Sequence, residues 1–155
     1  MPLEIVSRSP EETQALGQKL GEMAKEDDVL LLAGELGAGK TCLVQGLARG
    51  LGIREYTLSP SFVILRTYQG RLTLYHLDFY RLEEKEVLDL GLEDYLSAGG
   101  ITVVEWAERG RQLWPQEYLL ISLGFVSESQ RRLRFEPHGR KYEERIEALK
   151  GWSWR

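Results

Sequence analysis

Cysteine and histidine are scarce in this sequence, which has one cysteine, Cys42, and two histidines, His76 and His138, among 155 residues. A single cysteine excludes an internal disulfide and any zinc site built from clustered cysteines, and it fits a reducing compartment. Neither histidine has a cysteine or a second histidine at the spacing of metal ligands, so a transition-metal site is not expected. We expect His76 to pack or form a hydrogen bond.

Long apolar runs are also missing. The longest, Val29–Ala33, is far shorter than the roughly 20 residues that cross a bilayer. The acidic N-terminal region lacks the basic segment followed by an apolar one that marks an export signal. These absences predict no membrane role and a cytoplasmic protein.

Net charge is small, −4 with a pI near 5.3, which argues against holding nucleic acid by bulk phosphate attraction. Charge is uneven, however, because the segment from Phe125 onward has eight lysines and arginines against five glutamates. This segment predicts a solvated face. The alternative is an RNA or partner contact that includes Trp152 and Trp154.

What the sequence does contain is typical of one folded domain covering 1–155, with 43% hydrophobic and 28% charged residues and no repeat or linker. A helix is predicted to begin at Ser9, with Pro10 at its first position and Glu12 closing a capping box. Strands are predicted at 29–33, 62–68, 72–78, 101–105, 118–123 and 131–135, and helical segments at 40–50, 83–90, 92–96 and 142–150. This order predicts an α/β fold with a mixed, mainly parallel central sheet that includes an antiparallel hairpin.

The segment Gly34–Thr41, GELGAGKT, fits the phosphate-loop pattern G-x-x-x-x-G-K-[ST] between a buried strand and an amphipathic helix. Its glycines let backbone N–H groups wrap a phosphate at the positive end of the helix dipole. Lys40 would face the β and γ phosphates, and the Thr41 hydroxyl suits Mg²⁺. The alternative is a glycine turn that only links strand to helix, but such a turn does not require lysine and threonine at these positions. The predicted nucleotide-binding residues are Gly34, Glu35, Leu36, Gly37, Ala38, Gly39, Lys40, Thr41 and Cys42.

A phosphate loop also needs an acidic residue at a strand end, and the candidates are Glu105 and Asp78. Glu105 ends the more apolar strand, where a buried carboxylate requires a cation or hydrogen-bond donors. We therefore assign Glu105, with Thr41, to Mg²⁺. Asp78 is better placed for a water or a loop at the edge of the site, or else forms a salt bridge to Arg81 or a helix cap. Lys40, Asp78 and Glu105 are the predicted catalytic residues.

Four segments in this order and spacing resemble the TsaE family, the small YjeE-type ATPases of bacterial tRNA threonylcarbamoyladenosine biosynthesis. They are Gly34–Thr41, Ser59–Phe62, Tyr75–Arg81 and Val104–Trp106. The resemblance runs over nearly the whole chain. The phosphate loop is common to many families, whereas the last two segments together are particular to this one.

The resemblance implies an ATP-binding protein that works with TsaD and TsaB proteins to place threonylcarbamoyl on N6 of adenosine 37 in tRNA. Transfer chemistry belongs to TsaD, so contact with tRNA is indirect or through the complex. In this family the residues matching Thr41 and Glu105 hold Mg²⁺, the one matching Asp78 lies near the γ-phosphate, and the first helix, here Ser9–Thr13, approaches the adenine.

Cys42, Ala107 and Ser61 depart from the family pattern, which has threonine, proline and threonine at these positions. Cys42 removes a hydroxyl contact to the α-phosphate but keeps the backbone N–H. Trp106 follows Glu105, and both a core position and a partner surface stay open for it.

Turnover by the isolated chain should be slow. Arg81 is the arginine closest in sequence to a catalytic candidate, and phosphoryl transfer commonly needs an arginine finger. Two rival functions remain. A small-molecule kinase shares the loop but needs an acceptor pocket and a lid, for which 106–117 leave little room. A nucleotide-sensing adaptor would hydrolyse ATP only incidentally.

Overall fold

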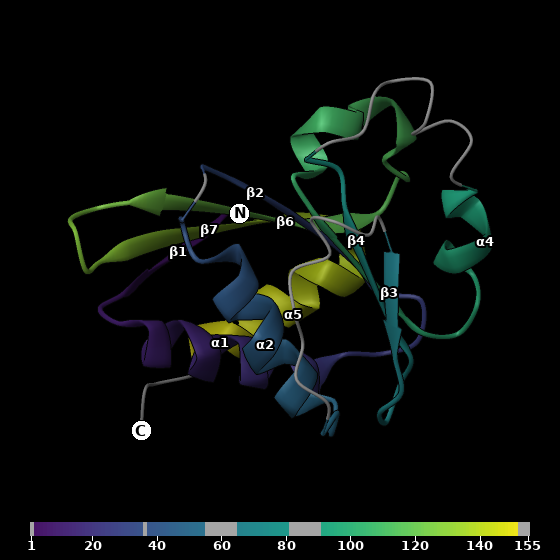
Figure 1. Ribbon diagram of the computed structural model, residues 1–155, viewed down its shortest axis with the longest axis horizontal. Coiled ribbons are helices and arrows are strands. Elements are labelled where there is room, and N and C mark those ends of the chain that lie inside the picture. The colour runs from purple at the N-terminus through teal and green to yellow at the C-terminus, as the bar shows by residue number, and fades with distance from the viewer. Residues whose placement is uncertain (1, 36, 55–64, 81–90, 152–155) are drawn as a thin grey trace.

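A seven-stranded sheet organises the computed structural model, which describes residues 2–35, 37–54, 65–80 and 91–151 (Figure 1). The strand order is β1-β7-β6-β2-β5-β4-β3. The strands are β1 (Leu3–Ser7), β2 (Val29–Gly34), β3 (Leu65–Tyr68), β4 (Leu74–Asp78), β5 (Ile101–Glu105), β6 (Tyr118–Phe125) and β7 (Arg131–His138). The four central strands are parallel, and β3, β7 and β1 join at the flanks in antiparallel pairs. The predicted mixed sheet with an antiparallel hairpin, β3–β4, is confirmed.

Helices cover both faces of this sheet (Figure 1). The elements are α1 (Pro10–Met23), α2 (Lys40–Gly50), α4 (Leu92–Leu96), the 3₁₀ helix η1 (Ala107–Leu113) and α5 (Arg140–Lys150). Apolar residues of α1, α2 and α5 share one buried cluster with the sheet, whereas α4 and η1 contribute to a second cluster on the opposite face. Strands β2 and β5 are apolar on both sides because helices cover both.

The start of α1 follows the prediction with one correction. The Ser9 side chain accepts a hydrogen bond from the backbone N–H of Glu12 at 3.1 Å, as an N-cap should. Glu12 does not return the bond to Ser9 itself, because its carboxylate accepts from the backbone N–H of Arg8 at 2.8 Å. The second hydrogen bond of the expected capping box thus comes from the N–H of Arg8, one residue before Ser9.

Helices α1 and α2 touch through their backbones, because both carry glycines four residues apart. A Cβ atom on Gly17 would lie 2.2 Å from the carbonyl oxygen of Leu43, and one on Gly46 would lie 2.0 Å from that of Gln14. Gly21 and Gly50 make equally close approaches further along the two helices. The N-terminal end of α1 is thus held next to the loop that begins α2.

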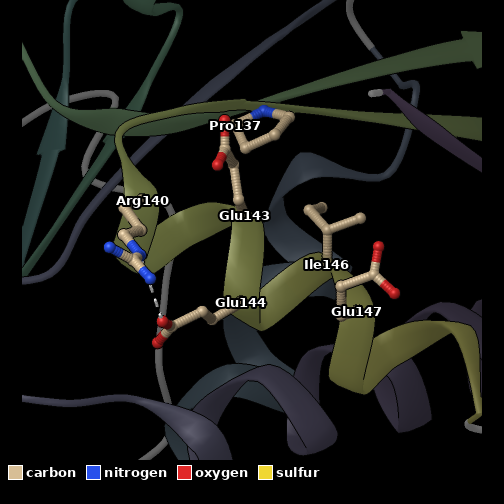
Figure 2. Close-up of a pocket in the computed structure, with 6 residues that line it drawn as sticks. All are labelled: Pro137, Arg140, Glu143, Glu144, Ile146 and Glu147. Carbon is tan, nitrogen blue, oxygen red and sulfur yellow. Dashed lines mark ion pairs between the residues drawn. The ribbon is translucent and has the colours of Figure 1, made fainter.

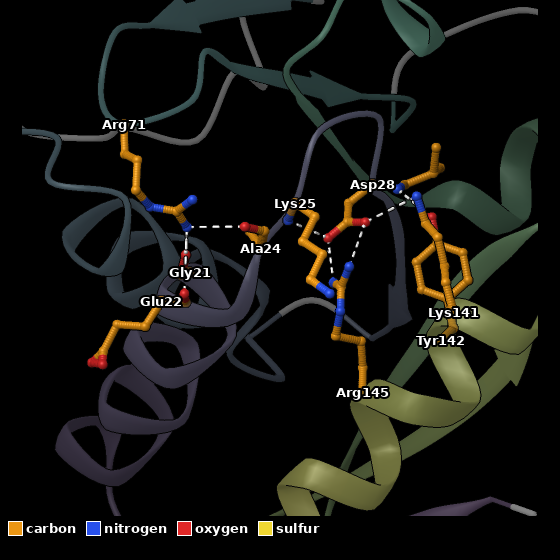
Figure 3. A network of polar contacts seen from close by, with 10 residues as sticks. Gly21, Glu22, Ala24, Lys25, Asp28, Arg71, Lys141, Tyr142 and Arg145 are labelled. Atoms are coloured by element: carbon orange, nitrogen blue, oxygen red, sulfur yellow. Dashed lines mark hydrogen bonds and ion pairs between the residues drawn. The ribbon is translucent and has the colours of Figure 1, made fainter.

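A buried ionic network fixes α5 at the amino end of β2 (Figure 3). Asp28, fully buried, accepts two hydrogen bonds from the Arg145 guanidinium and lies 3.1 Å from Lys141 Nζ. The Tyr142 hydroxyl accepts from the backbone N–H of Val29 at 2.8 Å, and burial raises the pKa of Tyr142 to about 12, which keeps it neutral. These contacts join residues that are more than 110 positions apart in the sequence.

A second contact in the same view closes the C-terminal end of α1. The Arg71 guanidinium donates to the carbonyl oxygens of Gly21 at 2.8 Å and Ala24 at 3.0 Å (Figure 3). Carbonyls in the last turn of a helix have no partner within it, so Arg71 satisfies groups that the helix leaves open.

Several element boundaries differ from the predictions. Strand β1 was not predicted, β4 begins two residues later than expected, and β6, β7 and α5 are longer. The start of the first hairpin strand, at 62–64, and the predicted helix at 83–90 lie outside the described residues. No described helix has the length and apolar character needed to cross a membrane.

Candidate nucleotide and metal site

The loop between β2 and α2 requires glycine at three of its positions. Gly34, Gly37 and Gly39 have φ values of 146°, 82° and 104°, in the region that side chains disfavour. At Gly34 a Cβ atom would also lie 2.4 Å from the carbonyl oxygen of Leu123. Ala38 is fully buried, and its N–H bonds the carbonyl of Glu35 at 3.1 Å. The predicted phosphate-loop segment is thus a tight turn at the helix start; Leu36 lies outside the described residues.

Lys40, the first residue of α2, turns back into the loop. Only 5% of it is exposed, and its Nζ donates to the carbonyl oxygens of Gly34 and Glu35, the latter at 3.0 Å. It also lies 4.0 Å from the centre of the Trp106 ring. Burial lowers the pKa of Lys40, opposed by the carboxylates of Glu108, Glu105 and Asp78. The Lys40 ammonium is therefore hydrogen-bonded to two neutral carbonyl oxygens, which a phosphate group can replace as acceptors.

Thr41 and Glu105, predicted to share a metal ion, lie next to each other. Thr41 Oγ1 donates to Glu105 Oε1 at 3.4 Å. The other oxygen, Oε2, lies 2.5 Å from His76 Nε2, and both His76 and Glu105 are nearly fully buried. The buried carboxylate thus meets hydrogen-bond donors, and His76 makes the hydrogen bond expected of it.

Asp78 lies beside Glu105, because the two residues are register partners at the ends of β4 and β5. It is 5% exposed and accepts a hydrogen bond from the backbone N–H of Tyr80 at 2.8 Å. Burial raises the pKa of Asp78, the Tyr80 N–H lowers it, and the Glu105 charge raises it. Two carboxylates at adjacent strand ends form a negative site that attracts a cation. Arg81, the alternative partner of Asp78, lies outside the described residues.

Sequence reasoning missed the contribution of η1, although its charges follow directly after Glu105. Glu108 accepts a hydrogen bond from the backbone N–H of Gly34 at 3.2 Å. Arg109 donates to the carbonyl of Tyr80 at 2.9 Å and lies over the Tyr80 and Trp106 rings. Trp106 itself has a φ of 56° and is half-buried, so it lines the site between Lys40 and Tyr80.

Mg²⁺ fits the chemistry of the donors gathered here. The hydroxyl of Thr41 and the carboxylate of Glu105 are hard oxygen ligands close enough to bind one ion. Within the described ranges no group of three or more His, Cys, Asp or Glu side chains could hold a metal on its own. Mg²⁺ is typically bound by one or two protein oxygens together with phosphates and waters, so these two ligands suit a metal that arrives with a nucleotide.

A pocket of about 150 Å³ opens beside the loop. It lies between the start of α1, the loop and the turn joining β6 to β7, and is lined by Ser9, Pro10, Thr13, Gly37, Gly39, Cys42, Glu128, Ser129 and Arg131. Burial raises the pKa of Cys42, with Glu11 adding to the effect and Arg131 opposing it, so this residue stays a thiol at neutral pH. The predicted α1 segment and Cys42 thus meet at one opening.

A larger pocket, of about 470 Å³, lies on α5 and the end of β7 (Figure 2). Its lining includes Glu143, Glu144 and Glu147 with one arginine, Arg140, which is paired to Glu144. Three carboxylates disfavour a phosphate group, so this pocket does not compete with the loop as a nucleotide site. Other segments named from the sequence, Ser59–Ser61, Trp152 and Trp154, lie outside the described residues.

Comparison with known proteins gives a consistent result. A family model described as threonylcarbamoyl adenosine biosynthesis protein TsaE matches residues 7–133. The tRNA threonylcarbamoyladenosine biosynthesis protein TsaE of Bacillus subtilis is 43% identical over 142 residues, which cover 91% of this chain and 89% of the relative. The protein of that name from Treponema pallidum is 42% identical, over 84% of this chain and 98% of the relative. The crystal structure of Bacillus subtilis YdiB superposes with a TM-score of 0.86 at 36% identity, over 97% of this chain and 95% of that one.

Proposed function

Because this chain belongs to the TsaE family of tRNA threonylcarbamoyladenosine biosynthesis proteins, we propose that it is a Mg²⁺-dependent ATP-binding protein and slow ATPase. It acts with TsaD and TsaB proteins in forming N6-threonylcarbamoyladenosine at position 37 of tRNA. The observation that carries the nucleotide part is the glycine loop, with Lys40 buried inside it and the Thr41–Glu105 pair directly behind.

Lys40 and the loop bind the phosphates. Nucleotide binding exchanges the contacts of Lys40 Nζ with two loop carbonyls for charge-assisted bonds to the β and γ phosphates, which are stronger. The N–H groups in the first turn of α2, which begins at Lys40, add the positive end of the helix dipole.

Thr41 and Glu105 hold the metal, and Asp78 acts beside it. Bound Mg²⁺ neutralises charge on the phosphates as it develops in phosphoryl transfer. Asp78 lies in register with Glu105, and we assign it to orienting the attacking water near the γ-phosphate. Burial raises the pKa of Asp78, so its ionised carboxylate is a stronger base than an exposed one.

Slow turnover follows from the arginine positions. Arg109, on the side of the loop where Asp78 and Glu105 lie, is engaged with the Tyr80 carbonyl and two aromatic rings. An arginine held in this way does not reach a transferring phosphate without rearrangement. Partner binding is proposed to supply the missing charge or alignment, which is worth about three to five powers of ten.

The pocket between α1 and the β6–β7 turn takes the nucleoside end of ATP. It is continuous with the loop through Gly37 and Gly39, and it offers the Ser9 and Thr13 side chains on one side and Arg131 on the other. A kinase is less well supported, because η1 fills the stretch after Glu105 where a lid would be needed.

Isothermal titration of ATP with Mg²⁺ tests the nucleotide part. Lys40→Ala is expected to weaken binding at least tenfold while the thermal unfolding midpoint shows an intact fold. Lys25→Ala, which removes an exposed lysine away from the loop, is the matched control and should bind normally. Equal affinity of Lys40→Ala and the parent chain would rule out the phosphate-loop assignment.

Phosphate release, measured alone and with TsaD and TsaB, tests the coupling. The free chain should be slow and the complex faster, with Asp78→Ala losing the stimulated rate but still joining the complex when ATP is present. A free chain as fast as the complex would contradict the proposal. ATP-dependent assembly without any change in turnover would favour the adaptor, and phosphate transfer to a small acceptor would favour the kinase.

A further inference from the structure

Two buried side-chain nitrogens in the described part of the chain lack a hydrogen-bond partner: Arg66 Nε and His76 Nδ1. They belong to residues that stand directly opposite each other in the β3–β4 pair. Opposite residues of an antiparallel pair project to the same face, with Cβ atoms about 4.5–5.5 Å apart. The two side chains therefore start from neighbouring positions on one face of the sheet, although neither residue was assigned to ligand binding above.

The two atoms are also chemically complementary. His76 Nε2 lies 2.5 Å from the Glu105 carboxylate, which only accepts, so Nε2 carries the proton. In the neutral imidazole that carries its proton on Nε2, Nδ1 offers a lone pair. Arg66 Nε–H can only donate, so it suits Nδ1 as a partner; the two atoms are not bonded directly in the structure, and one water can join them.

The orientation of Glu105 depends on this histidine. One carboxylate oxygen is bonded to His76, and the other is the oxygen that lies next to Thr41 Oγ1. A carboxylate held at one oxygen cannot rotate freely, so the second oxygen stays directed at the position where an ion would bind. Groups that hold metal ligands in this way typically change metal affinity by about 10–100-fold when removed.

We propose that His76 is a positioning residue of the Mg²⁺ site, holding Glu105 Oε2 so that Oε1 and Thr41 Oγ1 face one ion, and that Arg66 holds His76 in turn. The observed contacts run from His76 on β4 through Glu105 on β5 to Thr41 on α2, and the proposed Arg66 contact extends them to the edge strand β3. Through Arg66, the position of the edge strand β3 would then affect metal binding. This inference rests on the proposed function, because it presupposes that ATP binds with Mg²⁺.

The test is the gain in ATP affinity that Mg²⁺ provides, defined as the Kd in EDTA divided by the Kd with Mg²⁺, both from calorimetry. His76→Leu should lower this gain at least tenfold and leave the Kd in EDTA within twofold of the parent chain. His76→Gln should restore the gain to within threefold, because its amide can donate to Glu105 from nearly the same place. His138→Gln is the matched control, since His138 is exposed and stacks on Tyr118.

Arg66 is tested in the same assay. Arg66→Met and Arg66→Lys both lack Nε–H and should each lower the gain about threefold, and His76→Leu combined with Arg66→Met should be no worse than His76→Leu alone. A normal gain in Arg66→Lys would show that charge, not Nε–H, matters and would overturn the Arg66 step.

The outcomes separate the two levels of inference. A parent chain that gains nothing from Mg²⁺ contradicts the proposed function, whereas a normal parent with an equally normal His76→Leu overturns only the role of His76. If His76→Leu does not fold, His76→Gln and His76→Asn decide the matter: the shorter asparagine should lose the gain that glutamine keeps, and equal gains would overturn the proposal.

Discussion

At the amino end of β2, Asp28 meets the cations of Arg145 and Lys141, while at the carboxyl ends of the neighbouring strands β4 and β5, Asp78 and Glu105 lie beside each other near Lys40. At both places, charged side chains at the ends of strands of one sheet are buried. In the first, the one carboxylate has two cationic partners and a backbone N–H. In the second, two buried carboxylates share their surroundings with one lysine.

The difference in pairing distinguishes a carboxylate that stabilises the fold from carboxylates that are proposed to bind a ligand. A buried charge that is fully paired can be removed only at a large cost to folding. Buried carboxylates that are partly paired keep an attraction for a further cation, so they mark the place where Mg²⁺ and nucleotide are proposed to bind. Variants of Asp28 should therefore lose stability and keep ATP affinity, whereas variants of Glu105 should keep stability and lose Mg²⁺-dependent ATP affinity.

The largest effect is expected for Asp28→Ala, which leaves Arg145 buried without its partner. The free energy of unfolding should fall by about 3–5 kcal/mol, with Tm lowered by about 2–4 °C per kcal/mol. Chemical denaturation measures the first value and calorimetry the second. ATP affinity, titrated at a temperature where the variant is folded, should stay within twofold.

Asp28→Ala combined with Arg145→Met sharpens this prediction, because it removes the uncompensated charge as well. The double variant should be more stable than Asp28→Ala alone. If it is less stable, packing by the arginine stem and not charge pairing holds α5 in place.

Glu105→Gln should show the reverse pattern. Glutamine keeps an oxygen for His76 to bond but removes one of two adjacent charges, so stability should be unchanged or higher. The gain in ATP affinity from Mg²⁺ should fall at least tenfold. Thermal unfolding and calorimetry with and without Mg²⁺ give both readouts, and a stability loss as large as that of Asp28→Ala would erase the contrast between the two ends.

Asp78→Asn should change how stability depends on pH. Burial raises the pKa of Asp78 in the folded state, so the folded protein binds a proton that the unfolded chain has released, and stability falls as pH rises above about 3.8. Asparagine avoids this loss and can still accept the bond from Tyr80 N–H. Tm at pH 7 should rise by about 2–4 °C per kcal/mol relieved, and the difference should shrink toward pH 4. A difference that does not vary with pH would contradict this explanation.

The smallest effect is expected for Lys141→Ala. Its ammonium lies 3.1 Å from Asp28, but 37% of the side chain is exposed, so solvent screens the pair. The free energy of unfolding should fall by about 0.5 kcal/mol. Arg145→Ala, measured in the same denaturation experiment, should lower it several times more. Equal losses would show that both cations are needed to balance Asp28.

The central elements could be predicted because their signals are local. Val29–Ala33 and Ile101–Glu105 are short apolar runs, and the cap at Ser9 is encoded within four residues. Strand β1 could not be predicted in the same way. It is a five-residue edge strand whose partner is β7, more than 120 residues along the chain, so its stability depends on pairing and not on its own pattern.

The sequence by itself determined the central strands, the glycine turn that begins α2 and the family, because backbone turns, glycine positions and the Lys-Thr pair act over a few consecutive residues. Which side chains meet behind the loop was decided only by the tertiary structure. His76 reaches Glu105, Arg66 stands opposite His76, and Glu108 returns to Gly34 because strand order and register bring them together. Hydrogen bonds and ion pairs act over a few ångströms, and a one-residue change of register would turn the strand side chains of Arg66, His76 and Glu105 to the other face of the sheet.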